Sequence, residues 1–540
     1  MTRRAMRLTA AVALAAASAL VLGTRATPAF AGQPELPRAY VDTTTVAAGG
    51  RTITVAGGGS FQSALDRARP GDVITLEAGA VFTGPFTLPK KSGEGWITVR
   101  TSAAERELPA PGVRIDPTYA RVMPTLEAAR GAVLVTASGA HHYRFVGVEI
   151  RPVARVALVN LVQLGAGETT LEALPSYIIF DRCYLHGDPD KGTRRGIAMN
   201  ARAVAVIDSY LTDFKDVSVD SQAIAAWTGP GPFKIVNNTL EASGENLMLG
   251  GADPAIARLV PSDVEIRRNR FAKPLGWKAG EPEFQGTRWA VKNLFELKNA
   301  RRVLVEGNIF ERNWAQAQAG FAIQLTVRNE EGRAPWSVVE DIAFLSNVVR
   351  QVGGGINVLG RDGNHPSEQT RRLRIANNLF EDVGGPRWTG PGTFVQLLEG
   401  TAHVTIEHNT VLQRGPILFA EGVSHTSFTF RDNIVTHNAA GIAGTGTGTG
   451  ASTLDTFFPG AVVRRNVIIG GPAHRYPHEN FFPASLEKVG FVAGRYRLGA
   501  GSPHRSSGTD GRDPGVDLEA LAAAMAGGSN LQALTTEPAR

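Results

Sequence analysis

The chain has almost no cysteine, since Cys183 is the only one among 540 residues. A single thiol cannot form an internal disulfide bond, so the protein must be stabilised by its core and not by cross-links. Beyond residue 31 the sequence also lacks any apolar run long enough to span a bilayer. Recognisable amphipathic helices are few, whereas glycine occurs 61 times. Few helices and many glycines indicate tight corners between short strands.

The first 31 residues have the composition of an export signal. Three arginines within the first seven residues precede an Ala/Leu/Val run over 8–23, and the Ala-Phe-Ala at 29–31 fits a small-residue cleavage site. We expect cleavage after Ala31 and a secreted or periplasmic mature protein. The net charge of +6 falls to +2 once the four arginines of this segment are removed, because the segment holds no acid. A nucleic-acid partner is therefore not indicated.

One phrase recurs along the middle of the chain. It is clearest at residues 303–310, Val-Leu-Val-Glu-Gly-Asn-Ile-Phe, where apolar residues stand five and three positions before an Asn and two after it. Successive asparagines in this frame are 24 to 39 residues apart, a spacing typical of a coil with fixed core strands and variable loops. Cys183 and Ser209 occupy the same slot upstream, so we expect Cys183 to be buried and unreactive. The asparagines in this frame are Asn238, Asn269, Asn308, Asn347, Asn378, Asn409, Asn433 and Asn466.

This phrase predicts an all-β fold, a right-handed parallel β-helix of about 10–12 coils with three strands per coil. Apolar residues two apart face one side of a strand, so the positions five and three before each Asn point inward. The Asn then forms a bend, where its amide can bond to equivalent amides one coil above and below, roughly 4.8 Å away. Turn preference explains one or two such asparagines, but not eight at one offset. The sequence therefore predicts a buried asparagine ladder.

The two ends of the solenoid need covers, because an exposed apolar end invites edge pairing. Ser60 is placed to cap a helix over 61–68 that Pro70-Gly71 ends, and this helix is expected to cover the first coil. Residues 32–50 are predicted to be a linker, 51–480 the β-helix domain with its cap, and 481–540 a C-terminal capping segment and tail. A helix over Asp517–Met525 is expected to cover the other end. The Gly/Thr/Ala-rich stretch Gly441–Ser452 is expected to be flexible.

The segment from Ser60 to Gly79 also carries a family resemblance. Its runs Ser-Phe-Gln-Ser-Ala-Leu at 60–65 and Pro-Gly-Asp-Val-Ile-Thr-Leu at 70–76 resemble the N-terminal cap of secreted right-handed parallel β-helix proteins of the pectin-lyase-like superfamily. The resemblance covers residues 55–480 approximately and is specific for fold but poor for function. Members include pectate and alginate lyases, chondroitinases, polygalacturonases, epimerases and phage tailspikes.

Outward side chains of the first strand in each coil should form a polar row, because parallel strands stack equivalent residues. With Phe295 and Leu297 inward, Glu296 and Lys298 face outward. Amides suit sugar hydroxyls, arginine pairs with uronate carboxylates, and aromatic faces pack on sugar rings, so the row suits an acidic polysaccharide. The predicted substrate-binding residues are Trp227, Asn246, Lys292, Gln324, Asn357, Arg361 and Gln396.

The resemblance implies that substrate binds along this face and that a Lys or Arg abstracts the proton α to a uronate carboxylate, whose charge Ca²⁺ or basic side chains neutralise. On the next coil, Phe321 and alternate residues after it are predicted to face the core, so that Arg328 points outward near Lys298. A nearby guanidinium and burial should lower the pKa of Lys298 toward that of a general base. We therefore assign Lys298 as base and Arg328 as carboxylate clamp. Glu296 orients them or holds a metal.

Other readings stay open. The protein is expected to be a monomer. Charged residues on the solvent side of a strand are usually a solvated face, so a non-catalytic carbohydrate-binding or surface protein on the same scaffold is the first rival. A glycoside hydrolase or epimerase would need a second carboxylate near Glu296. The Asn-Thr-Asp, Asp-Asp and Gly-His-Gly signatures of polygalacturonases are missing, as is the Asp-rich calcium site of pectate lyases. Glu245 and Asp253 are weaker candidates for a Ca²⁺ site.

Overall fold

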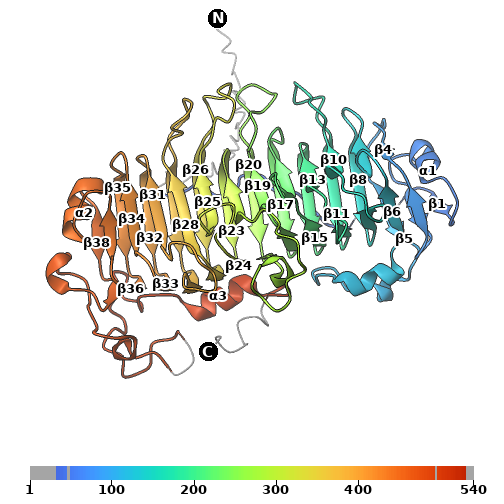
Figure 1. Cartoon of the computed structure of the whole chain (residues 1–540). Helices are drawn as coiled ribbons and strands as arrows, with labels where there is room; N and C mark the ends of the chain where they lie inside the picture. Colours follow the sequence, from blue (N-terminus) through green and yellow to red (C-terminus); the bar gives the residue numbers. More distant parts are fainter. Residues whose placement is uncertain (1–31, 46–48, 493–495, 531–540) are drawn as a thin grey trace, which may run out of the picture. The chain divides into compact units, whose positions relative to one another are not determined.

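The structure, a computed structural model, describes residues 32–45, 49–492 and 496–530. The predicted export signal lies outside the described residues. Three parallel sheets run the length of the described chain, and consecutive strands of one sheet belong to consecutive coils (Figure 1). This is the predicted right-handed parallel β-helix, and the 12 strands of its smallest sheet agree with the predicted 10–12 coils.

Each complete coil contributes one strand to each sheet, and the coils at the two ends are incomplete. Sheet A contains β1 (Thr52–Val55), β2 (Val73–Leu76), β5 (Ile97–Thr101), β8 (His141–Val146), β11 (Ser176–Asp181), β14 (Arg202–Ile207), β17 (Gly231–Val236), β20 (Ser262–Arg267), β23 (Ala300–Glu306), β26 (Val339–Leu345), β29 (Arg371–Ala376), β32 (Ala402–Glu407), β35 (Thr426–Arg431) and β38 (Val462–Arg464). Sheet B contains β3 (Val81–Thr83), β6 (Thr125–Ala128), β9 (Glu149–Pro152), β12 (Tyr184–His186), β15 (Tyr210–Phe214), β18 (Thr239–Ala242), β21 (Arg270–Ala272), β24 (Ile309–Asn313), β27 (Val348–Val352), β30 (Leu379–Val383), β33 (Thr410–Gln413), β36 (Ile434–Thr436) and β39 (Val467–Ile469). Sheet C contains β4 (Phe86–Leu88), β7 (Leu134–Thr136), β10 (Asn160–Leu164), β13 (Arg195–Met199), β16 (Gln222–Ala226), β19 (Glu245–Leu249), β22 (Asn293–Leu297), β25 (Phe321–Thr326), β28 (Gly354–Leu359), β31 (Val395–Leu398), β34 (Leu418–Glu421) and β37 (Ile442–Gly444).

The inward residues of the repeated phrase form one continuous core. Val303 on β23 aligns with Val264 on β20 and with Ile342 on β26, and all three side chains are buried. Because equivalent apolar side chains stack along the axis, each coil buries its apolar face against its two neighbours, which no coil could do alone. The core cluster extends in this way from Val55 to Tyr476.

The predicted asparagine ladder is present at the bend between sheets A and B. From Asn238 onward, each Nδ2 donates to the Oδ1 of the next coil at 2.9–3.1 Å. The ladder has one rung more than predicted, because Asn480 receives the bond from Asn466 although it lacks the apolar frame. Upstream, Cys183 donates its backbone N–H to Ser209, and its side chain is fully buried. Burial raises the pKa of the Cys183 thiol to about 12, which fits the expected unreactive role.

The two ends of the described solenoid are covered by different helices. The predicted helix α1 (Phe61–Arg67) covers the first coil, with the Ser60 hydroxyl accepting from the Ser63 backbone N–H. At the other end the cover is α2 (Ala451–Phe457), whose Leu454 and Phe457 join the core (Figure 1). The expectation of a flexible stretch over 441–452 was therefore wrong, because β37 and the start of α2 lie there. Short 3₁₀ helices occur at Glu105–Glu107, Pro117–Val122, Leu275–Trp277, Ala473–Arg475 and Leu486–Val489.

Helix α3 (Leu518–Met525) forms where the sequence predicted a helix, but it does not cover an end. Leu521 and Met525 pack on the outer face of sheet B, against Ile309, Val348 and Leu379 of three successive coils. The prediction of an end cap was wrong because these outward apolar residues, which begin β24, β27 and β30, provide a binding face along the side of the solenoid. No helix in the described part of the chain has the length and hydropathy needed to cross a membrane.

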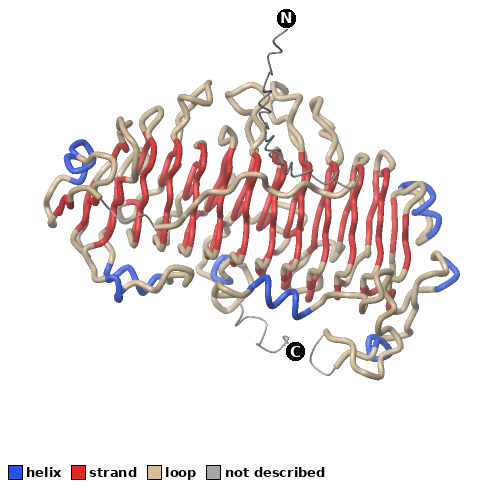
Figure 2. The backbone as a smooth tube through the Cα atoms, turned by 180° about the vertical axis from the view of Figure 1, so that it is seen from behind, coloured by secondary structure: helices blue, strands red, loops and turns tan. Residues whose placement is uncertain are grey.

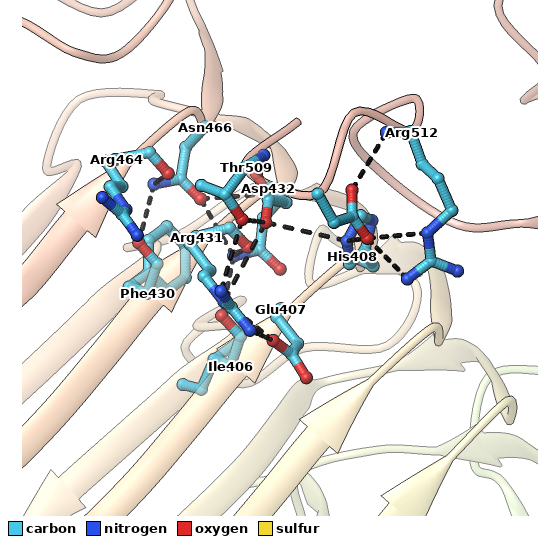
Figure 3. Close-up of polar contacts among 12 residues, drawn as sticks. Ile406, Glu407, His408, Phe430, Arg431, Asp432, Arg464, Asn466, Thr509 and Arg512 are labelled. Atoms are coloured by element: carbon cyan, nitrogen blue, oxygen red, sulfur yellow. Dashed lines mark hydrogen bonds and ion pairs between the residues drawn. The ribbon is translucent and has the colours of Figure 1, made fainter. Parts of the chain in front are cut away.

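Polar contacts fix the segment before α3 to the bend that carries the ladder (Figure 3). Asp432 accepts hydrogen bonds from the backbone N–H and the hydroxyl of Thr509, and Arg431 pairs with Glu407 at 2.6 Å. His408 Nε2 lies 3.2 Å from a carboxylate oxygen of Asp510. The C-terminal segment is therefore held to the side of the coils by side chains that directly flank the ladder asparagines.

The predicted linker also contacts the solenoid. Residues 32–45 cross the outer face of sheet A, roughly perpendicular to its strands (Figure 2). The backbone N–H groups of Glu35 and Arg38 donate to the carboxylates of Asp341 and Asp263, at 3.0 and 2.9 Å. Further along, Arg144 Nη1 donates to the Thr43 carbonyl. Residues 32–45 thus form a strap, not a free linker.

Candidate functional site

The outer face of sheet C carries two neighbouring hollows. The first, which we call the cationic hollow, has a volume of about 310 Å³. It is lined by Glu296, Lys298, Gln318, Ala319, Phe321, Gln324, Thr326, Arg328, Asn357 and Gln396. The second, the tryptophan hollow, has a volume of about 300 Å³ and includes Trp227, Asn200, Glu168, Asp253 and Glu331. Six of the ten predicted catalytic and substrate-binding residues therefore line the cationic hollow, and Trp227 lines the other.

Strand register brings the row together as predicted. Glu296 on β22 aligns with Gln324 on β25, Gln324 with Asn357 on β28, and Asn357 with Gln396 on β31. Asn357 Nδ2 donates to Gln324 Oε1 at 2.7 Å, and Gln396 Nε2 donates to Asn357 Oδ1 at 3.0 Å. These side chains form a short amide row on the floor of the cationic hollow. Gln324 is buried, but Asn357 and Gln396 are partly exposed, so these two can also bond to a ligand.

Lys298 and Arg328 follow the ends of β22 and β25 on adjacent coils. The Arg328 backbone N–H donates to the Lys298 carbonyl at 2.9 Å, so the two residues adjoin on neighbouring coils, and both line the cationic hollow. Arg328 Nη1 donates to Asp362 at 2.9 Å. Within the described chain its Nε and Nη2 have no hydrogen-bond partner, and these two donors form the fork that binds a carboxylate in bidentate fashion.

The pKa of Lys298 is shifted in the direction opposite to the prediction. Burial disfavours its charge, but the carboxylates of Glu296 and Glu330 outweigh burial and raise the pKa. The Lys298–Glu330 ion pair has an Nζ–Oε1 distance of 2.5 Å. Sequence reasoning counted the neighbouring guanidinium of Arg328 and missed Glu330, which lies in the loop after β25. Lys298 is therefore protonated at neutral pH.

Glu296 is held firmly beside these cations. Asn293 Nδ2 donates to one of its carboxylate oxygens at 2.9 Å, and the Thr326 hydroxyl lies 3.3 Å from the other. Glu245, one coil earlier, is also buried, and Gln222 Nε2 donates to it at 2.7 Å. Burial raises the pKa of Glu245 to about 7, with the negative charges of Glu296 and Asp220 adding to the rise. Sheet C thus carries two interacting carboxylates beside its cations.

The outward position predicted for Asn246 and the inward position predicted for Phe321 are both wrong, for one geometric reason. Strict alternation breaks at the start of the sheet C strands, where two consecutive residues face the core, such as Leu294 with Phe295. Asn246 is consequently buried, with Nδ2 donating to two backbone carbonyls, so its side chain does not face outward as predicted. Phe321 lines the cationic hollow instead of joining the main core.

The inward amide of Asn246 helps to enclose Lys273. Five oxygen atoms lie within 3.2 Å of Lys273 Nζ, including Asn246 Oδ1 and four backbone carbonyl oxygens. Burial lowers the pKa of Lys273 to about 7, whereas these oxygens and the charge of Glu245 favour the protonated form. Lys273 thus joins two coils beneath sheet C through these five contacts.

Two other predicted binding residues lie outside both hollows. Arg361 is exposed, and its only hydrogen bond within the described residues is a long one, 3.4 Å, to the Ser367 carbonyl. Lys292 pairs with Asp220 at 2.5 Å and lies 3.5 Å from Glu245. Sequence reasoning missed Gln318, which lines the cationic hollow, and Asp362, which holds Arg328. Both lie in loops, where strand periodicity gives no signal.

The weak calcium candidates do not fit a cation. Asp253 accepts the backbone N–H groups of Glu331 and Arg333, at 3.2 and 2.8 Å. Glu245 is engaged by Gln222 and Lys292. Oxygens that accept from N–H donors are turned toward positive groups already present, and a Ca²⁺ ion needs six to eight oxygen ligands. Within the described residues no group of three acidic, His or Cys side chains could hold a metal.

The known proteins that this chain resembles are distant in sequence. No protein-family model matches the sequence, and a search of curated proteins finds no match. The catalytic unit of a thermostable GH87 alpha-1,3-glucanase from Streptomyces thermodiastaticus strain HF3-3 has a TM-score of 0.46 and 13% identity, covering 79% of this chain and 70% of the glucanase. The PL6 family alginate lyase AlyGC has a TM-score of 0.47 and 14% identity, covering 79% of this chain and 53% of the lyase. Pectate lyase Pel9A has a TM-score of 0.36 and 14% identity, covering 85% of this chain and 92% of the pectate lyase.

The chain thus spans about half the length of AlyGC. At these identities the likeness concerns the fold alone. The three parallel sheets and the ladder define the protein as a right-handed parallel β-helix.

Proposed function

We propose that the protein is an exported polysaccharide lyase that cleaves an acidic, uronate-containing polysaccharide by β-elimination in the cationic hollow. The observation that carries the proposal is the presence of Lys298 and Arg328 in one hollow, with a guanidinium fork that has no partner among the described residues and a floor of amides. The fork suits a uronate carboxylate, and the amides suit sugar hydroxyls.

In this mechanism Arg328 binds the carboxylate of the uronate and stabilises the charge that develops on it. The neutral form of Lys298 takes the proton from the carbon next to that carboxylate. The electron pair of the broken C–H bond forms a carbon–carbon double bond as the glycosidic C–O bond breaks. The departing sugar oxygen takes up a proton from water. Glu296 and Glu330 fix the position of the Lys298 side chain, and their charge also makes its neutral form scarce at neutral pH.

The test is a screen of uronate polymers for products that absorb in the ultraviolet, since only elimination creates an unsaturated sugar end. Replacing the base, Lys298→Ala, should reduce the rate at least about 100-fold. Lys191→Ala, at an exposed lysine in the turn between β12 and β13, is the matched control and should leave the rate unchanged. Wild-type turnover that survives Lys298→Ala would contradict the assignment, and absence of any product would favour a carbohydrate-binding protein.

A glycoside hydrolase is the second candidate, favoured by the interacting carboxylates. Glu245, with its pKa near 7, could donate a proton to a leaving group while Glu296 stays available as a second carboxylate. Hydrolysis would give shortened chains without the ultraviolet chromophore. Glu245→Gln would then abolish turnover, whereas the lyase proposal predicts that Lys298→Ala is the more damaging change.

A further inference from the structure

The strap over residues 32–45 has the sequence of a polyproline II segment. Pro34 and Pro37 stand three positions apart, and residues 32–45 form neither helix nor strand. Proline fixes its own φ at about −65° and restricts the residue before it to extended conformations. The chain from Gln33 to Pro37 is therefore extended before it contacts anything. A polyproline II chain repeats every three residues, whereas a β-strand repeats every two.

The contacts of the strap follow the three-residue repeat. The backbone N–H groups of Glu35 and Arg38, each directly after a proline, both donate to sheet A, at 3.0 and 2.9 Å. Pro37 is buried and Pro34 is half-buried, whereas the Leu36 side chain is 51% exposed. The Leu36 N–H has no hydrogen-bond partner among the residues that the structure describes. In a β-strand, residues three apart would face opposite sides, so the strap binds as polyproline II.

The repeat of the strap matches the spacing of the coils that it crosses (Figure 2). The acceptors Asp341 on β26 and Asp263 on β20 are separated by one strand, β23, so they lie two strand spacings, or about 9.6 Å, apart. Three residues of polyproline II rise about 9.3 Å. A further step of three residues leads from Glu35 back to Gly32, where a side chain would meet the His403 ring at 3.2 Å. His403 is on β32, two strands beyond β26.

The two acceptor carboxylates are held in place by the solenoid itself. Arg302 donates Nε and Nη2 to Asp263 at 2.7 and 3.0 Å, and Arg372 does the same to Asp341 at 2.6 and 2.7 Å. These four residues occupy equivalent positions in successive coils, with φ between 52° and 62°. A carboxylate that binds an arginine fork still has lone pairs for another donor. The acceptors are thus oriented by residues outside the strap.

The second half of the strap is bound without any covalent link to sheet A. Val41 is buried in a cluster with Ala203, which lies on β14. Arg144 Nη1 donates to the Thr43 carbonyl at 2.9 Å, and Lys234 Nζ donates to the Thr43 hydroxyl at 2.9 Å. A separate peptide of the same sequence could make every one of these contacts.

We propose that the outer face of sheet A is a binding site for proline-rich peptides in the polyproline II conformation, and that the strap is its ligand within the same chain. The site binds two backbone N–H groups three residues apart, each directly after a proline of a Pro-x-x-Pro segment. While the strap is bound, it closes the site to other chains. The proposal is independent of the reaction on sheet C.

The test separates the strap from the coils after folding. A specific protease site in place of residues 46–48 lets the whole chain fold before the strap is cut. A fluorescent peptide of residues 32–45, added in excess, should then replace the cut strap, as measured by anisotropy and by mass spectrometry of the released strap. The uncut protein should bind the same peptide at least about tenfold more weakly, because its attached strap competes at a high effective concentration.

Changes in the peptide test how it is recognised. N-methylation of Glu35 and Arg38 removes both N–H donors, keeps every side chain and should weaken binding at least about 30-fold. N-methylation of Leu36 is the matched control and should leave the Kd unchanged. Pro34→Ala combined with Pro37→Ala should weaken binding about tenfold, because the free peptide becomes less ordered. Gln33→Ala, at an exposed position, should have no effect.

Three results would overturn the proposal. The first is a cut protein that keeps its circular dichroism spectrum but takes up no labelled peptide. The second is equal binding of the peptides methylated at Glu35 and Arg38 and at Leu36. The third is loss of the folded spectrum on cutting, which would show that the strap is a part of the fold and not a ligand.

Discussion

The protein contains two rows of stacked amides that obey the same hydrogen-bonding geometry in different surroundings. In the asparagine ladder, Asn308 donates to Asn347 at 3.0 Å, and in the sheet C row, Asn357 donates to Gln324 at 2.7 Å. The ladder is sealed in the bend between sheets A and B, and Asn308 is 0% exposed. The sheet C row forms the floor of a hollow.

The difference lies in how completely each amide is satisfied. The second hydrogen of Asn308 Nδ2 reaches backbone carbonyls, and its Oδ1 accepts both the side chain and the backbone N–H of Asn269. Asn357 has one donor and one acceptor bond to its neighbours in the row and keeps capacity for a ligand. Saturated amides stabilise the coil, and unsaturated ones are available to bind sugar, so changes in the two rows should affect different measurements.

The largest effect is expected in the ladder. Asn308→Ala leaves the Nδ2 and backbone N–H of Asn269 without their acceptor and removes a donor from Asn347, all in a buried bend. We expect the free energy of unfolding to fall by about 3 kcal/mol. Denaturant titration measures it, provided that one transition is observed by two probes. A loss similar to that of Asn357→Ala would remove the distinction between the rows.

The second-largest effect is expected in the pH dependence of lyase activity, which should change about tenfold per pH unit. Because the pKa of Lys298 is raised, its neutral form increases as pH rises, and lyase activity should climb through the alkaline range. Because the pKa of Lys298 is higher in the folded than in the unfolded protein, the Lys298–Glu330 pair stabilises the fold fully below the unfolded-state pKa. That stabilisation is lost only as the pH rises through the folded-state pKa. The rise in lyase activity should therefore occur at a lower pH than any unfolding. An activity that falls above about pH 7 would instead indicate protonated Glu245 and hydrolysis.

The smallest effect is expected in the sheet C row. Asn357→Ala should raise KM about threefold and lower the free energy of unfolding by less than about 1 kcal/mol, because water can replace the lost partners at a partly exposed site. Initial rates and denaturant titration on the same preparation measure both. A stability loss above that limit would show that the row is also structural.

The sequence was sufficient to predict those parts of the molecule that repeat. The ladder from Asn238 to Asn466 follows from an offset kept in each coil, and the N-terminal cap follows from its capping and stop residues. Glu296, Lys298 and Arg328 meet in one hollow because parallel strands stack, although Arg328 lies two residues beyond the position level with Lys298. The errors fall where the repeat gives no information. Asn246 lies at the start of β19, where alternation breaks, and Glu330 comes from a loop whose position relative to Lys298 depends on tertiary packing. A side chain's pKa depends on such neighbours, so its direction could not be predicted from strand pattern.

The strap over 32–45 and the C-terminal segment have a consequence for how the molecule comes apart. A solenoid in which each coil touches only its neighbours can fray from either end, one coil at a time. The strap joins distant coils, because Glu35 contacts β26 and Thr43 contacts β8. The C-terminal segment does the same, since it contacts Asp432 and then ends with Asn530 donating to the carbonyls of Asn269 and Gly307. Both tethers must release before distant coils can separate. Heating should therefore unfold the coils between the two tethers as one cooperative unit. The cationic hollow should keep its shape until that unit unfolds.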